Sequence, residues 1–140
     1  MPRILSIDYG GKRTGIAVTD PLQIIATGLT TVRSHELIKY LEKYILENNV
    51  ECFVVGEPKQ MNNLDSESAK AVNDFVKQLK KKFGNIPVKR FDERFTSKMA
   101  IQSIRDSGAK KSTRQNKELV DMVSATILLQ SYMESVASGN

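Results

Sequence analysis

The order of strand-like and helix-like segments limits the folds open to this chain more than any other feature. Three extended segments come first, at residues 3–9, 14–19 and 24–32, with no helical pattern between them. Turn residues separate them: Gly10-Gly11 after the first and Asp20-Pro21 before the third. Short turns connect antiparallel neighbours. The sequence therefore predicts three consecutive antiparallel strands.

Two further strands are predicted at residues 51–56 and 87–92, and each follows a helical pattern. After Ser34, a candidate N-cap, apolar residues recur at the spacing of one helical face until Asn48. A second such pattern ends at Gly84. Because helical crossovers join parallel strands, these two strands should extend the first three in parallel.

The remainder of the chain is predicted to be helical, with a short helix over residues 96–107 and a long C-terminal helix. Ser112 and Gln115 have the spacing of a capping box for the start of the long helix. Residues 58–65 and 108–112 are less regular and are candidate mobile loops. The predicted order is β-β-β-α-β-α-β-α-α, which makes an α/β fold with a five-stranded mixed sheet flanked by helices.

The size of the chain suits one domain over residues 1–140, since 40% hydrophobic residues can fill one core. No segment approaches the roughly 20 apolar residues that span a bilayer, and the N-terminus runs directly into a strand pattern. We therefore expect a cytoplasmic protein without membrane contact. Cys52 excludes an internal disulfide and is interpreted as a small buried hydrophobe, and His35, beside Glu36, as a surface residue.

Positive charge is concentrated in one part of the sequence. The net charge is +5, but residues 80–117 carry 12 lysines and arginines against 3 acids, so that this stretch is +9 and the remainder −4. Clustered cations release counterions when they meet phosphates, which favours a polyanionic partner, although a run such as residues 80–82 is also typical of a solvated face. With 6% aromatic residues and no tryptophan, recognition should depend on backbone and shape more than on base stacking.

Three acids stand at or near the ends of different predicted elements. Asp8 ends the first strand, Glu93 follows the fifth, and Asp121 lies about two turns into the last helix, on a face with small residues that permits close approach to the sheet. Oxygen ligands without histidine or cysteine suit magnesium or manganese. Two such cations about 4 Å apart can activate water and stabilise the leaving oxygen of a phosphodiester. The acids therefore predict a metal-dependent nuclease.

Other interpretations remain open for these residues. Each acid could form only an ion pair: Glu93 with Arg94 or Arg90, and Asp121 with Lys117 at helical spacing. In addition, Asp8 and the glycines after it are similar to the phosphate loop of actin-like ATPases and sugar kinases. Those enzymes place two such domains around a cleft, so an ATPase of this length would need a dimer or another partner.

Four segments together resemble the YqgF/RuvX family in order and spacing. They are residues 8–20, 54–58, 92–96 and 120–125, and the resemblance covers nearly the whole chain. It implies a ribonuclease H-like fold related to the resolvase RuvC, and a nuclease that matures the 5′ end of pre-16S rRNA; an older name for members is Holliday junction resolvase. Glu57 departs from the family pattern, where many members have a hydrophobic residue. It could add a fourth carboxylate, but we favour an exposed side chain.

Carried over to this sequence, the resemblance makes Asp8, Glu93 and Asp121 the metal-binding, catalytic acids, and Arg13 and Arg94 backbone or active-site contacts. The full set of predicted nucleic-acid contacts is Lys12, Arg13, Arg94, Lys110, Lys111, Arg114 and Lys117. We expect precursor rRNA as the first choice of partner and four-way DNA as the second, with ribosomal particles as a further candidate.

Two further expectations concern assembly and turnover. No clear exposed apolar patch commits the chain to dimerise, which favours a monomer or a weak dimer. A non-catalytic nucleic-acid-binding module is the rival class of function. Three acids argue against it, because a pure binder gains nothing from negative charge where a phosphate must lie.

Overall fold

A computed structural model describes residues 2–57, 66–92 and 116–137 of the chain. Its centre is a five-stranded sheet of order β3-β2-β1-β4-β5. The strands are β1 (Arg3–Asp8), β2 (Arg13–Thr19), β3 (Ala26–Arg33), β4 (Val50–Glu57) and β5 (Val88–Asp92). β1, β2 and β3 pair antiparallel, whereas β4 and β5 extend β1 in parallel. Both parts of the predicted sheet are thus confirmed.

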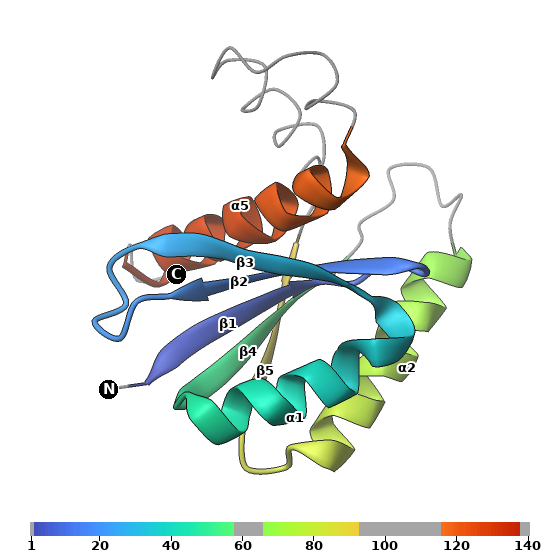
Figure 1. The fold of residues 1–140 in the computed structure, drawn as a ribbon, viewed down its shortest axis with the longest axis horizontal. Helices are drawn as coiled ribbons and strands as arrows, with labels where there is room; N and C mark the ends of the chain where they lie inside the picture. Colours follow the sequence, from blue (N-terminus) through green and yellow to red (C-terminus); the bar gives the residue numbers. More distant parts are fainter. Residues whose placement is uncertain (1, 58–65, 93–115, 138–140) are drawn as a thin grey trace.

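Helices cover both faces of this sheet. The 3₁₀ turn η1 (Ser34–Glu36) leads into α1 (Leu37–Glu47); α2 (Ser66–Lys82) follows β4, and α5 (Lys117–Ala137) ends the described chain. In Figure 1, α1 and α2 lie below the sheet and α5 lies above it. The predicted helix over residues 96–107 and the candidate loops at 58–65 and 108–112 lie outside the described residues. None of the described helices is long and apolar enough to cross a membrane.

The starts of two helices differ from the prediction. Ser34 caps no helix; its hydroxyl donates to the Gly10 carbonyl and lies 2.8 Å from the Thr14 hydroxyl. At α5, Asn116 is the cap, since its Oδ1 accepts the Leu119 N–H at 3.2 Å. Ser112 and Gln115 lie outside the described residues. Because α5 starts at residue 117, Asp121 is about one turn into the helix rather than two.

The side chains of the strands alternate between two cores. Large residues such as Leu5, Phe53 and Leu79 fill the core between the sheet and α1 and α2. The core beneath α5 combines small residues, among them Ala17 and Ala125, and Cys52 with the larger Leu128 and Leu129 of the helix. Cys52 is 6% exposed, which confirms its interpretation as a buried hydrophobe, and its burial raises the pKa of the thiol.

Candidate active site

Asp8 lies on the face of the sheet that α5 covers. Side chains along a strand alternate, so Asp8 shares a face with Ser6. The buried Ser6 hydroxyl donates to the Ala125 carbonyl of α5 at 2.8 Å. Asp8 is two residues further along β1 and is partly exposed. Its carboxylate therefore belongs to the end of the sheet beneath the first part of α5.

A row of three residues across the sheet brings Asp121 to the same place. Asp8 pairs with Gly15 of β2, which pairs with Thr31 of β3. A Cβ on Gly15 would overlap the main-chain carbonyl of Asp121, so the helix backbone lies directly on the strand here. Thr31 donates its hydroxyl to the Glu118 carbonyl at 2.6 Å. The start of α5 is thus fixed over the row that contains Asp8.

Arg13 completes this group. Its Nε donates to Oδ2 of Asp121 at 2.7 Å, and the two side chains are 33% and 23% exposed. The ion-pair partner of Asp121 is therefore Arg13, not Lys117 at helical spacing. Arg13 is the first residue of β2, and Ser34 bonds the preceding turn through the Gly10 carbonyl. Residues from β1, β2 and α5 consequently converge at one end of the sheet.

The ends of β4 and β5 lie at this same edge. Glu57 pairs with Asp92 in register, and both strands run parallel to β1. Glu93 follows Asp92 directly, but it lies outside the described residues, as do Arg94, Lys110, Lys111 and Arg114. Nor is the Glu57 side chain described, so its predicted exposure stays a prediction. Within the described ranges, no group of three histidine, cysteine or acidic residues could hold a metal ion.

The described cations of the positive run, residues 80–117, do not all lie near the acids. Lys117, at the start of α5, is exposed at the edge that carries Asp8, and so is Lys12, in the turn after β1 and outside that run. Residues 80–82 instead end α2, towards the edge where β5 begins, and the Lys82 ammonium lies 3.2 Å from Glu42. That part of the run is a solvated helix end remote from the acids.

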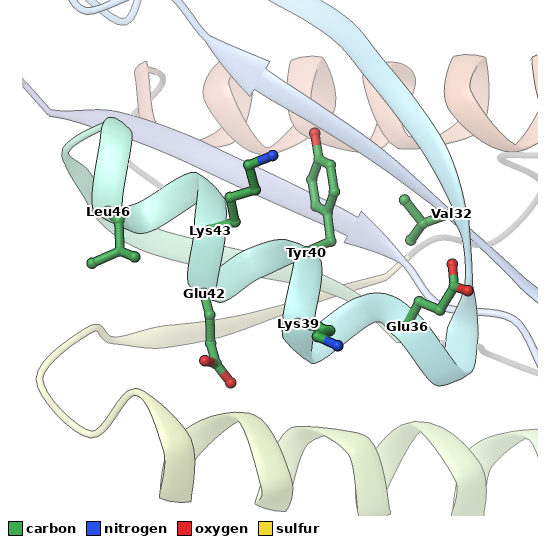
Figure 2. A pocket seen from close by; sticks show the side chains of 7 residues that line it. All are labelled: Val32, Glu36, Lys39, Tyr40, Glu42, Lys43 and Leu46. Atoms are coloured by element: carbon green, nitrogen blue, oxygen red, sulfur yellow. The ribbon is translucent and has the colours of Figure 1, made fainter.

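A groove of about 580 Å³ lies away from the acids, along α1 beside the end of β3. Figure 2 shows its lining residues: Val32, Glu36, Lys39, Tyr40, Glu42, Lys43 and Leu46. His35 precedes this helix, is 74% exposed and lies 3.7 Å from Glu36, which confirms its interpretation as a surface residue. The groove and the histidine therefore contribute nothing to the converging acids.

Asp8, Arg13 and Asp121 were predicted from the sequence, but the residues that bring them together were not. Ser6, Gly15 and Thr31 carry no charge and occur in strand patterns, where small residues of this kind attract no attention. Their common signal is small size on strand positions that face α5, opposite the small residues of that helix. The described carboxylates suit a hard divalent cation, because magnesium and manganese prefer oxygen ligands.

Comparison with known proteins identifies the family. The model of RuvX, a family described as Holliday junction resolvase, matches residues 2–135. The chain belongs to the RuvX family. This assignment confirms the resemblance found in the sequence, and it decides against the ATPase interpretation of the glycine-containing turn.

Similar RuvX proteins cover almost the whole chain. A protein from Phocaeicola vulgatus is 59% identical over 135 residues, which are 96% of this chain and 97% of that protein. One from Flavobacterium johnsoniae is 58% identical over 135 residues, covering 96% and 98%. Both carry a provisional name as a pre-16S rRNA nuclease.

Two solved structures confirm the fold. The fowlpox virus resolvase bound to Holliday junction DNA gives a TM-score of 0.58 at 18% identity, covering 96% of this chain and 98% of that one. Thermus thermophilus RuvC with a Holliday junction substrate gives 0.56 at 16% identity, covering 99% and 98%. This RuvX protein therefore has the predicted ribonuclease H-like fold.

Proposed function

We propose that this chain is a metal-dependent nuclease that hydrolyses phosphodiester bonds of precursor 16S rRNA near its 5′ end, with residues 1–140 acting as one domain in the cytoplasm. The observation that carries the proposal is the pairing of Asp8 with Gly15, against which the Asp121 backbone lies, with Arg13 bonded to the Asp121 carboxylate. The names of the relatives supply the substrate class.

Asp8 and Asp121, with Glu93 as a third acid, would hold magnesium or manganese. When bound, such a cation activates water and neutralises charge on the phosphate. The chain contributes fixed positions: Gly15 lets the α5 backbone rest on β2, and the Ser6 bond to Ala125 prevents the helix from sliding along β1. The backbone positions that carry the two described acids are therefore fixed before a substrate binds.

Arg13 has a second role beyond its bond to Asp121. A guanidinium offers five N–H donors, and the observed ion pair uses the one at Nε. The side chain is 33% exposed, so its terminal nitrogens can reach a phosphate oxygen while Nε orients the acid. Arg13 would thus stabilise negative charge that develops during cleavage.

Contacts to the nucleic-acid backbone are proposed for the cations at this edge. Lys12 and Lys117 are exposed there. Arg94, Lys110, Lys111 and Arg114 join them on sequence grounds alone. Phosphate contacts fix position without selecting bases, so binding should weaken steeply as salt rises.

The test is cleavage of a labelled pre-16S 5′ fragment in magnesium, manganese or EDTA. Asp8→Asn and Asp121→Asn should each lower the rate about a thousandfold while RNA binding is retained, because several kcal/mol of barrier are lost at about 1.4 kcal/mol per tenfold. Glu118→Gln, which removes an exposed acid from the same helix, is the matched control and should cleave normally. Undiminished cleavage by Asp8→Asn would remove that residue from the mechanism.

A Holliday junction resolvase is the second candidate, favoured by the description of the family. A synthetic four-way junction in the same assay separates the two. Symmetric cuts in the junction with intact RNA would assign the activity to DNA, whereas trimming of the RNA alone would support the first proposal. Metal-independent binding without cleavage of either would favour the non-catalytic binding module.

A further inference from the structure

The turn between β2 and β3 exposes an apolar surface. Leu22, Ile24 and Ile25 are 61%, 67% and 61% exposed within four residues. The strand predicted from residue 24 begins only at Ala26, so the residues before it form an exposed apolar patch that the sequence pattern did not indicate. Three large neighbouring side chains are thus left in solvent, which makes this cluster a candidate interaction site.

Hydrogen bonds hold this turn in one conformation. The Asp20 carboxylate accepts the N–H groups of Ile24 and Ile25, each at 2.7 Å, and that of Leu22 at 3.1 Å. Gln23 has a left-handed φ of 58° and donates its side-chain amide to the Pro2 carbonyl at 3.0 Å. A partner would therefore meet a preorganised surface and pay little conformational entropy to bind it.

The end of α5 continues the same surface. A cavity of about 370 Å³ lies between residues 24–26 of the turn and Gln130, Met133 and Glu134 of the helix. Val136, further along, is 55% exposed. In Figure 1 the C-terminal end of α5 lies beside the turn, whereas the start of α5 lies at the opposite end of the same face of the sheet. We call residues 20–26 and 130–136 the distal surface.

Charge on the distal surface selects the class of partner. The surface contains Asp20 and Glu134 and no lysine or arginine, and Glu51 accepts a bond from Gln23 at its border. The nearby Arg3 guanidinium is engaged within the chain, because its Nη1 donates to the Thr19 carbonyl at 3.0 Å. Carboxylates repel a phosphate backbone. They also disfavour a second copy of the chain, because a two-fold contact of this surface with itself would bring two acidic borders together without a lysine or arginine between them.

We propose that the distal surface docks a basic protein that accompanies the RNA substrate, while the opposite end of α5 engages the RNA itself. This inference rests on the proposed function for its choice of RNA. An apolar cluster bordered by carboxylates is complementary to an apolar socket bordered by lysine and arginine, and proteins bound to RNA commonly present such basic surfaces.

The test compares two forms of one RNA: protein-free pre-16S RNA, and the ribonucleoprotein particles that contain this precursor, isolated from cells. Binding is measured on the full chain in an Asp8→Asn background, so that neither form is cut. The parent should bind the particle at least about tenfold more tightly than free RNA. Combined Leu22→Ser, Ile24→Ser and Ile25→Ser should abolish this preference and leave the affinity for free RNA unchanged.

Two further variants sharpen the result. Leu46→Ser removes a side chain that is 87% exposed on α1, outside the distal surface, and should keep the preference. Glu134→Lys adds positive charge and should strengthen binding to free RNA, but it should weaken binding to the particle. Opposite signs for the two forms of RNA would distinguish a docking contact from general attraction.

Equal binding of the parent to both forms, or an undiminished preference in the triple variant, would overturn the proposal. So would concentration-dependent dimerisation, seen by light scattering, that the triple variant loses, since a second copy would then occupy the surface. If no metal-dependent cleavage occurs with either form while the binding preference follows the variants as expected, the proposed nuclease function fails and the docking surface stands.

Discussion

The two faces of the sheet are packed by different means. Beneath α1 and α2, large side chains pack against one another; the ring centroids of Phe53 and Phe83, for example, are 5.6 Å apart. Beneath α5, apolar packing that includes Leu128 and Leu129 is joined by close polar contacts: Ser6 and Thr31 bond main-chain carbonyls of the helix, and Gly15 allows backbone to touch backbone. Both faces stabilise the fold by apolar burial, but the second also fixes where a particular residue, Asp121, must lie.

Leu79→Ala on the first face should have the largest effect on folding. Leu79 is fully buried in α2, and such a truncation costs about 2–5 kcal/mol in free energy of unfolding. The folded molecules should cleave RNA at the normal rate, because no part of the α5 contact changes. Urea unfolding and initial rates at low temperature measure the two quantities. Lys81→Ala, at an exposed position of the same helix, is the control. A lower cleavage rate in fully folded Leu79→Ala would show that the packing beneath α1 and α2 also affects the site.

Gly15→Ala on the second face should lower activity even where the protein stays folded. The added methyl must push the Asp121 backbone away from β2, and overpacking costs about 1–3 kcal/mol or more in free energy of unfolding. Cleavage should fall at temperatures where the protein remains folded, as circular dichroism can verify. Gly11→Ala is a matched control, since its Cβ would meet nothing within 4 Å. Equal rates for the two variants would show that Asp121 tolerates displacement.

Arg13→Gln should separate orientation from stability. The ion pair with Asp121 is partly exposed, so its loss should change the free energy of unfolding by less than about 1 kcal/mol. Cleavage should fall about ten- to a hundredfold, as for other residues that orient metal-binding groups. Arg13→Lys keeps the charge but lacks the fork of donors, and it should recover only part of the rate. Full activity in Arg13→Gln would show that Asp121 does not require Arg13 for its orientation.

The smallest effect concerns Cys52, beneath α5. Burial raises the pKa of its thiol, so the neutral form persists at pH 8 and reaction with a thiol reagent should be slow in the native protein. Above the ordinary pKa of a thiol, ionisation favours the unfolded chain, and stability should decline there. Reaction as fast as that of the urea-unfolded protein would show that α5 opens readily from the sheet.

The sheet could be predicted from the sequence because its order follows local rules. Short turns dictate antiparallel pairs, and helical crossovers dictate parallel ones. Ser34 was misassigned because its partner Gly10 is 24 residues away, and a serine before an apolar pattern usually caps a helix. Likewise, the ion pair of Asp121 joins residues 108 apart, whereas spacing along a helix suggests only near neighbours. Contacts between residues far apart in the sequence cannot be inferred from local sequence patterns.

The 21 residues of α5 form one uninterrupted helix, about 30 Å long, that begins over Asp8 and ends beside Ile25. A helix this long, fixed to three strands, behaves as a rod. If a protein is held at one end, the bond to be cut at the other lies at a set distance from it. The length of the helix, rather than the base sequence, would then set the position of cleavage, which agrees with the low content of aromatic residues.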